Sequence, residues 1–233
     1  MTMKLYSDTD IQAIANAIRT KNGSSDTYTV SDMAQAITDI STGSSIDDII
    51  TASGISGEVR ITEATSTVGY ALANRQITSL YCDSITSIPN YWLFGCSRLQ
   101  TVVLPNSTSI GQQVFNGCGA SLKTVDFGKA NLSNNIFYTN LSGLNTIILR
   151  KSTGIATMTN TAVFNKTPFA NGGSGGTIYI PEVLYNHLGD GTSLDYKSAT
   201  NWSTYNGYGT ITWAKIEGSQ YENYYADGTP ISN

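Results

Sequence analysis

A short apolar motif recurs at a nearly fixed interval in the middle of this chain. Four six-residue segments share it, and they begin 22, 23 and 22 residues apart, at 77–82, 99–104, 122–127 and 144–149. A second apolar element recurs between them, as Leu93-Phe94-Gly95-Cys96, as Val114-Phe115-Asn116-Gly117-Cys118 and as Ile136-Phe137. One unit of this size has too little apolar surface to offset the backbone entropy of ordering it, about 1 to 2 kcal/mol for each residue. The repeats therefore predict a solenoid, in which each unit is buried against its neighbours.

A strand and a second apolar turn within about 22–23 residues indicate an α+β solenoid of the leucine-rich-repeat kind, with stacked parallel strands. The fourth and sixth positions of each segment point the same way along a strand, so we expect them to form the core. These inward residues are Leu80, Cys82, Val102, Leu104, Val125, Phe127, Ile147 and Leu149. The positions between them then face outward, in one row of Ser79, Thr101, Thr124 and Thr146 and a second row of Tyr81, Val103, Asp126 and Ile148.

The repeat also predicts how the chain is divided. We expect a helical N-terminal segment over 1–42, a linker over 43–57, the solenoid over 58–181 and a non-repeating C-terminal cap over 182–233. The strand at 177–180 follows an insertion of about nine residues and still stacks on Ile147. In the cap, Trp202, Ile211 and Trp213 are interpreted as side chains that cover the last rung rather than as a binding platform.

Two amphipathic helices are expected in the N-terminal segment. Ile11, Ile14 and Ile18 share one face of the first, and an apolar stripe of Met33, Ile37 and Ile40 runs along the second. Short helices with one narrow stripe are marginal in water. The stripes therefore need a partner surface, and these six residues are the candidates for attachment or for a homo-oligomer, a trimer among the options.

Composition and charge argue against several classes of partner. The net charge is -4, only 13% of the residues are charged, and no basic run occurs, so a nucleic-acid partner is not expected. No window approaches 18 apolar residues, and the N-terminus lacks the apolar region of a signal peptide. The sequence predicts a soluble protein that is neither inserted into a membrane nor exported by an ordinary signal peptide.

No pattern in the sequence indicates a reaction. His187 is the single histidine, and neither a phosphate-binding loop nor a calcium-binding loop is present. Cys96 and Cys118 occupy equivalent repeat positions and are interpreted, with Cys82, as small apolar core groups, a metal site or a disulfide being the alternative. We predict a protein that is not an enzyme and holds no cofactor or metal.

Three stretches resemble known proteins. Residues 85–105 and 108–118, with their Phe-Gly-Cys and Leu-Gln-Thr-Val-Val-Leu-Pro segments, resemble the BspA-type leucine-rich repeat. Residues 6–23 and 28–37 resemble the N-terminal segment of tail-associated proteins in phages and prophages of Gram-positive bacteria. Residues 177–181 and 196–202 are similar to the closing rung of the same tail proteins. The resemblance implies a virion tail, baseplate or fibre component.

The first hypothesis is therefore a non-enzymatic phage tail protein. Its N-terminus would attach or oligomerise, and its solenoid would recognise a host-surface glycan or protein, or a tail partner, from a place in the virion tail and outside the host cell. A bacterial cell-surface BspA-like adhesin and a purely structural virion subunit remain as alternatives. The candidate ligand-binding residues are the outward strand positions Arg60, Tyr81, Val103, Asp126, Ile148 and Tyr179. The alternative interpretation is that they form an ordinary solvated sheet surface.

Overall fold

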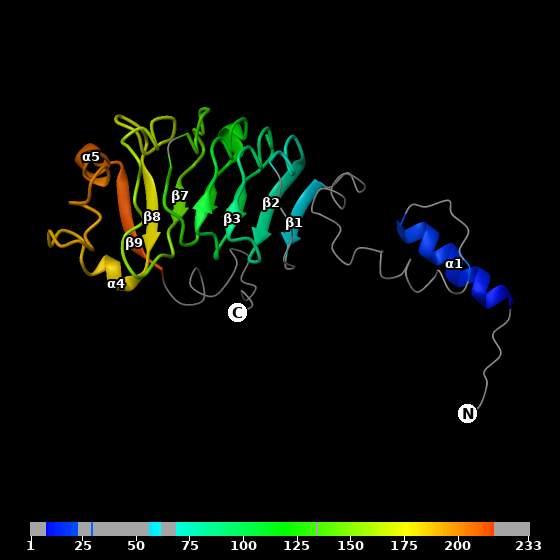
Figure 1. The fold of residues 1–233 in the computed structure, drawn as a ribbon. Helices are drawn as coiled ribbons and strands as arrows, with labels where there is room; N and C mark the ends of the chain where they lie inside the picture. Colours follow the sequence, from blue (N-terminus) through cyan, green and yellow to red (C-terminus); the bar gives the residue numbers. More distant parts are fainter. Residues whose placement is uncertain (1–7, 23–28, 30–55, 62–68, 134, 217–233) are drawn as a thin grey trace, which may run out of the picture. The chain divides into compact units, whose positions relative to one another are not determined.

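The computed structural model describes residues 8–22, 29, 56–61, 69–133 and 135–216 (Figure 1). The chain divides into two compact units, Met1–Ser44 and Ser45–Asn233. In the first unit, helix α1 spans Asp8–Asn22. Ala15 and Ile18 are buried, but Ile14 is 47% exposed, so the predicted apolar stripe is only partly covered. The second predicted helix, with Met33, Ile37 and Ile40, lies outside the described residues, as does the side chain of Ile11.

The second unit is built on a seven-stranded parallel sheet in which every strand pairs with the next one along the chain (Figure 1). Its strands are β1 Ser56–Ile61, β2 Gln76–Cys82, β4 Thr101–Val103, β6 Thr124–Asp126, β7 Thr146–Ile148, β8 Gly176–Ile180 and β9 Ile211–Lys215. A two-stranded sheet pairs β3 Ser87–Ile88 with β5 Ser109–Ile110. The remaining elements are the 3-10 helix η1 Gly119–Ser121 and the short helices α4 Glu182–Tyr185 and α5 Trp202–Tyr208. No helix in the described part of the chain is long and apolar enough to cross a bilayer.

The inward column of the solenoid is in register from strand to strand. Leu80 pairs with Val102, Val102 with Val125, Val125 with Ile147, and Ile147 with Ile178. All five side chains are completely buried. The predicted repeat solenoid with parallel strands is confirmed, including the pairing of the 177–180 strand across the insertion.

A column of aromatic rings lies behind the sheet strands. Phe137 packs with ring-centroid distances of 5.8 Å to Phe115 and 5.9 Å to Phe164, its counterparts in the neighbouring rungs, and 5.8 Å to Phe127. Rings at these separations add directional contacts to the apolar burial that holds adjacent rungs together.

The three cysteines are free thiols buried in the core. Burial raises the pKa of the Cys96 thiol to about 11 and raises the pKa values of Cys82 and Cys118 as well. These thiols therefore stay neutral and pack as apolar groups, as the sequence predicted. In the described part of the chain no cluster of three His, Cys, Asp or Glu side chains has the arrangement of a metal site.

The sheet continues past the expected solenoid boundary at residue 181, because β9 pairs with β8 and extends it by one more strand. One sequence interpretation of the repeats was wrong in detail. Phe94 is not the counterpart of Phe115, because Gly95 and Gly117 both have positive φ and fix the alignment of the two turns. That alignment places Leu93, not Phe94, in the core position of Phe115, and Phe94 is partly exposed.

Candidate functional site

Most of the candidate ligand-binding side chains that were expected on the outward face of the sheet are buried. Tyr81, Val103, Asp126 and Ile148 are only 5%, 2%, 0% and 2% exposed, so the expectation that they face solvent was wrong. The alternation along the strands nevertheless holds, because Tyr81 and Val103 form an apolar cluster separate from the main core. Arg60 is exposed and Tyr179 is half-buried. A ligand-binding role for this face stays a prediction.

Contacts between neighbouring side chains account for part of this burial. Strands about 4.8 Å apart bring long side chains in the same row into contact. The Arg60 guanidinium lies 4.5 Å from the centre of the Tyr81 ring. Arg150 Nε lies 2.6 Å from Asp126 Oδ2, and the Gly128 amide donates to Asp126 Oδ1 at 2.9 Å. Burial raises the pKa of Asp126, and the Arg150 charge opposes that rise.

An aromatic cluster on the first rungs is more accessible, since Tyr70 is exposed and Tyr91 and Phe94 are half-buried. The Tyr70 and Tyr91 rings stack with centroids 4.7 Å apart and an angle of 4°, and Phe94 meets Tyr70 edge-on at 5.9 Å. Tyr70 is 54% exposed. Both tyrosines have positive φ, 65° and 61°, a conformation that is costly for a bulky side chain.

The next two rungs place Gln113 and Asn135 at the corresponding positive-φ position. The turn itself therefore does not require an aromatic residue. The Tyr70–Tyr91 pair adds stacking area to a surface position that other rungs fill with an amide, which makes it a candidate contact surface.

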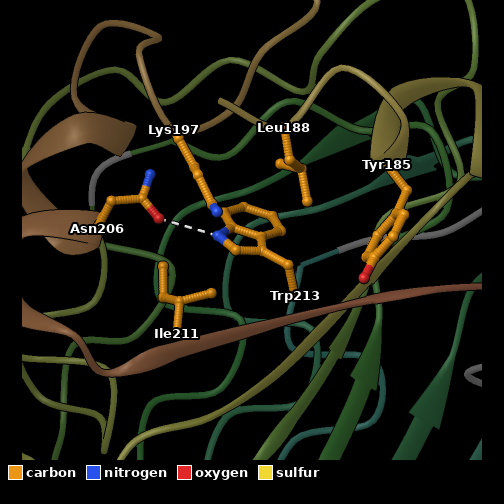
Figure 2. A pocket seen from close by; sticks show the side chains of 6 residues that line it. All are labelled: Tyr185, Leu188, Lys197, Asn206, Ile211 and Trp213. Atoms are coloured by element: carbon orange, nitrogen blue, oxygen red, sulfur yellow. Dashed lines mark hydrogen bonds between the residues drawn. The ribbon is translucent and has the colours of Figure 1, made fainter. Parts of the chain in front are cut away.

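A hollow lies at the end of the sheet, beside β9. Figure 2 shows this cap pocket, which has a volume of about 570 Å³ and is lined by Tyr185, Leu188, Lys197, Asn206, Ile211 and Trp213. Tyr185 ends α4, Asn206 belongs to α5, and Ile211 and Trp213 belong to β9. Volumes of this order are typical of small-molecule sites.

Trp213 is held in a fixed position at the pocket. Its Nε1–H donates to Asn206 Oδ1 at 2.9 Å (Figure 2). Its ring packs on Tyr196 at 5.0 Å and on Trp202 at 5.7 Å, and both of those rings are completely buried. Asn206 is held in turn, since its Nδ2 donates to the carbonyl of Tyr196 at 3.2 Å. The indole is therefore a rigid surface and not a mobile side chain.

Polar groups surround this aromatic surface. Lys197 is exposed and its side chain points into the pocket, with Tyr185 at the opposite side (Figure 2). Lys197 is the one charged residue among the described lining residues. A second hollow of about 620 Å³, which includes Ile155 and Thr200, has neither a charged nor an aromatic side chain among its described lining residues. The cap pocket thus offers an apolar surface, hydrogen-bonding groups and a positive charge together.

The sequence identified only part of this site. Trp202 is completely buried, which confirms the cap-packing interpretation for that residue. Trp213 and Ile211 pack in the cap and also line the pocket. Tyr185, Lys197 and Asn206 were not singled out, because they belong to no repeat and come together only in three dimensions.

Comparison with known proteins identifies the repeats. Residues 57–172 match the model of the BspA type leucine rich repeat region, in six copies. Neither the curated proteins nor the solved structures gave a match to the chain. The matched residues include the strands from β2 to β7, whose in-register stacking is the structural form of such a repeat. Residues 57–172 of this chain are a BspA type leucine-rich repeat region.

Proposed function

We propose that this chain is a non-enzymatic recognition protein of a phage or prophage tail. The observation that carries the recognition role is the BspA type repeat over residues 57–172, built as a sheet of parallel strands in register. Solenoids of this kind have extended surfaces on which side chains from successive rungs act together. The partly exposed Tyr70–Tyr91 cluster and the cap pocket supply aromatic contact area of the kind that recognition surfaces use.

The N-terminal unit is proposed as the attachment or oligomerisation part. Its resemblance to tail-associated proteins supports the placement in a tail. The 47% exposure of Ile14 on α1, next to the buried Ala15, leaves an apolar group available for a partner. A homo-oligomer, a trimer among the options, would cover such a group.

A bacterial cell-surface BspA-like adhesin is the second candidate, and the repeat match favours it equally. A purely structural virion subunit is the third. These candidates differ in where the protein is found and in what it binds.

Immunogold electron microscopy with antibodies against the chain separates the first two candidates. The cells are those of the organism that encodes it, before and after prophage induction. Gold on the tails of released particles is expected, whereas gold on the walls of uninduced cells, with none on particles, would refute the tail placement. The fluorescently labelled full chain should also bind intact host cells, and absence of binding would refute host recognition in favour of a structural subunit.

A further inference from the structure

We propose that the cap pocket binds a saccharide unit that carries an anionic substituent, a carboxylate or a phosphate. This assignment rests on the proposed recognition function and gives it a site and a ligand class. It is argued from the position of Trp213 in the sheet, from the support of its ring and from the groups around it.

The position of Trp213 in the sheet is the first argument. Trp213 pairs with Ile178, so it stands in the inward column that Leu80, Val102, Val125 and Ile147 fill in earlier strands. Those side chains are completely buried, but Trp213 is only half-buried. In the described part of the chain no strand follows β9 in the sheet, and two β9 side chains, Ile211 and Trp213, line the cap pocket.

The support of the indole is the second argument. Tyr196 and Trp202 pack on the Trp213 ring, and Asn206 accepts its N–H. A surface that is already ordered binds a ligand without the entropy cost of fixing a loose side chain. Trp202 is completely buried, whereas the Trp213 ring that packs on it is only half-buried. The indole lines the pocket together with Leu188 and Tyr185 (Figure 2).

The groups around the ring decide the ligand class. The C–H groups on one face of a pyranose are weakly positive and pack on the negative face of an aromatic ring. The Tyr185 hydroxyl and the Lys197 ammonium can bond to sugar hydroxyls at the edge of the pocket. No ion pair joins Lys197 to any residue that the structure describes, so its charge is available for a carboxylate or phosphate on the sugar.

Tryptophan fluorescence of the full chain can measure binding directly. The chain has three tryptophans, and Trp92 and Trp202 are completely buried, so a ligand in the cap pocket changes chiefly the signal of Trp213. The probes are glucuronic acid, glucose 1-phosphate and uncharged glucose. We expect saturable changes with the two anionic sugars, with dissociation constants on the order of 1 mM, and weaker binding of glucose. The two anionic probes separate a carboxylate site from a phosphate site.

Substitutions test the two groups separately. Lys197→Gln should weaken the anionic sugars about threefold to fivefold, as expected for an exposed ion pair, and leave glucose unchanged. Trp213→Phe should weaken all three sugars, measured by calorimetry because the fluorescent group is lost. Lys129→Gln, an exposed lysine outside the pocket, is the matched control and should bind like the unmodified chain. Far-UV circular dichroism checks that each variant is folded.

Three results would overturn the assignment: that neither anionic sugar binds, that glucose binds as tightly as the anionic sugars, or that Lys197→Gln leaves the affinity for the anionic sugars unchanged. Failure of the pocket assignment can be told apart from failure of the proposed function. If the unmodified chain and both pocket variants bind host cells equally well, recognition stands and the pocket assignment fails. If the sugars bind and cells do not, the pocket stands and host recognition fails.

Discussion

Replacing Phe137 by alanine should destabilise the solenoid strongly, whereas the same change at the next residue should not. Phe137 is 4% exposed and contacts rings in the rungs on both sides, Phe115 and Phe164. Truncating a buried phenylalanine costs about 3–5 kcal/mol, including the cavity that it leaves. Because ring contacts of about 0.5–1.5 kcal/mol each are lost toward both neighbours, we expect a cost of about 4–5 kcal/mol.

Tyr138→Ala is the matched control. Tyr138 is 48% exposed, and the Lys166 ammonium lies 5.2 Å from the centre of its ring. An exposed cation–π contact contributes about 0.5–1 kcal/mol, so this variant should lose no more than that.

Urea unfolding followed by far-UV circular dichroism is the assay. With a slope of about 2–3 kcal/mol per molar urea, Phe137→Ala should lower the midpoint by about 1.3–2.5 M and Tyr138→Ala by less than about 0.5 M. Weaker coupling between rungs should also broaden the transition, because each rung of a solenoid is stabilised by its neighbours. A loss below about 1 kcal/mol in Phe137→Ala, or equal losses in both variants, would refute the proposal that stacked rings couple the rungs.

Further variants and a change of pH test other features. Gly143→Ala should cost more than about 2 kcal/mol in urea unfolding, because the new Cβ would lie 1.9 Å from the carbonyl oxygen of Ala120; Gly207→Ala in α5, where nothing lies within 4 Å, should be neutral or stabilise by up to about 1 kcal/mol. The pKa of Cys96 is raised from 9.0 to about 11, so the unfolded chain loses this thiol proton first as the pH rises. The free energy of unfolding should therefore fall between pH 9 and pH 11, by up to about 1.4 kcal/mol per pH unit for this thiol, and thermal melting should show a smaller fall in Cys96→Ala. Tyr91→Asn relieves the strain of a bulky side chain at positive φ but loses the stack on Tyr70, so the free energy of unfolding should change by less than about 1 kcal/mol. A clear loss of cell binding by this variant at unchanged stability would assign the cluster to recognition.

The stacking of the strands could be predicted from the sequence because it depends on a period and an alternation. Leu80, Val102, Val125 and Ile147 recur at the spacing of one rung, and only in-register parallel pairing buries all four. The pairing of Ile178 across the insertion followed from the same rule, since a long connection costs little once the strand can be buried.

The exposure of individual residues could not be predicted in this way. Alternation correctly placed Val103 and Asp126 on the face opposite the core, but their burial depends on which other side chains contact them. The position of Phe94 was missed for a different reason. The two Phe residues were matched by type, whereas the turns are aligned by the positive-φ glycines Gly95 and Gly117, which put Leu93 in the core position of Phe115.

The cap pocket was missed because its residues share no period. Tyr185, Lys197, Asn206 and Trp213 come from separate segments after the last repeat, and they meet only because α4 and α5 pack beside β9. A single lysine or asparagine in such a segment does not indicate a binding pocket, because both residue types are common on protein surfaces. Trp213 did stand out, and its packing in the cap was correctly expected, but its second role as a pocket wall required the structure.

The strictly sequential pairing of β2, β4, β6 and β7 makes the solenoid adjustable in length. Each strand touches only the one before it and the one after it, so gain or loss of one whole repeat would leave matching surfaces to rejoin. Such a change would move the two ends of the sheet apart or together by about 4.8 Å while leaving the chemistry at either end intact. Variation in repeat number would thus set the reach of this protein independently of what it binds.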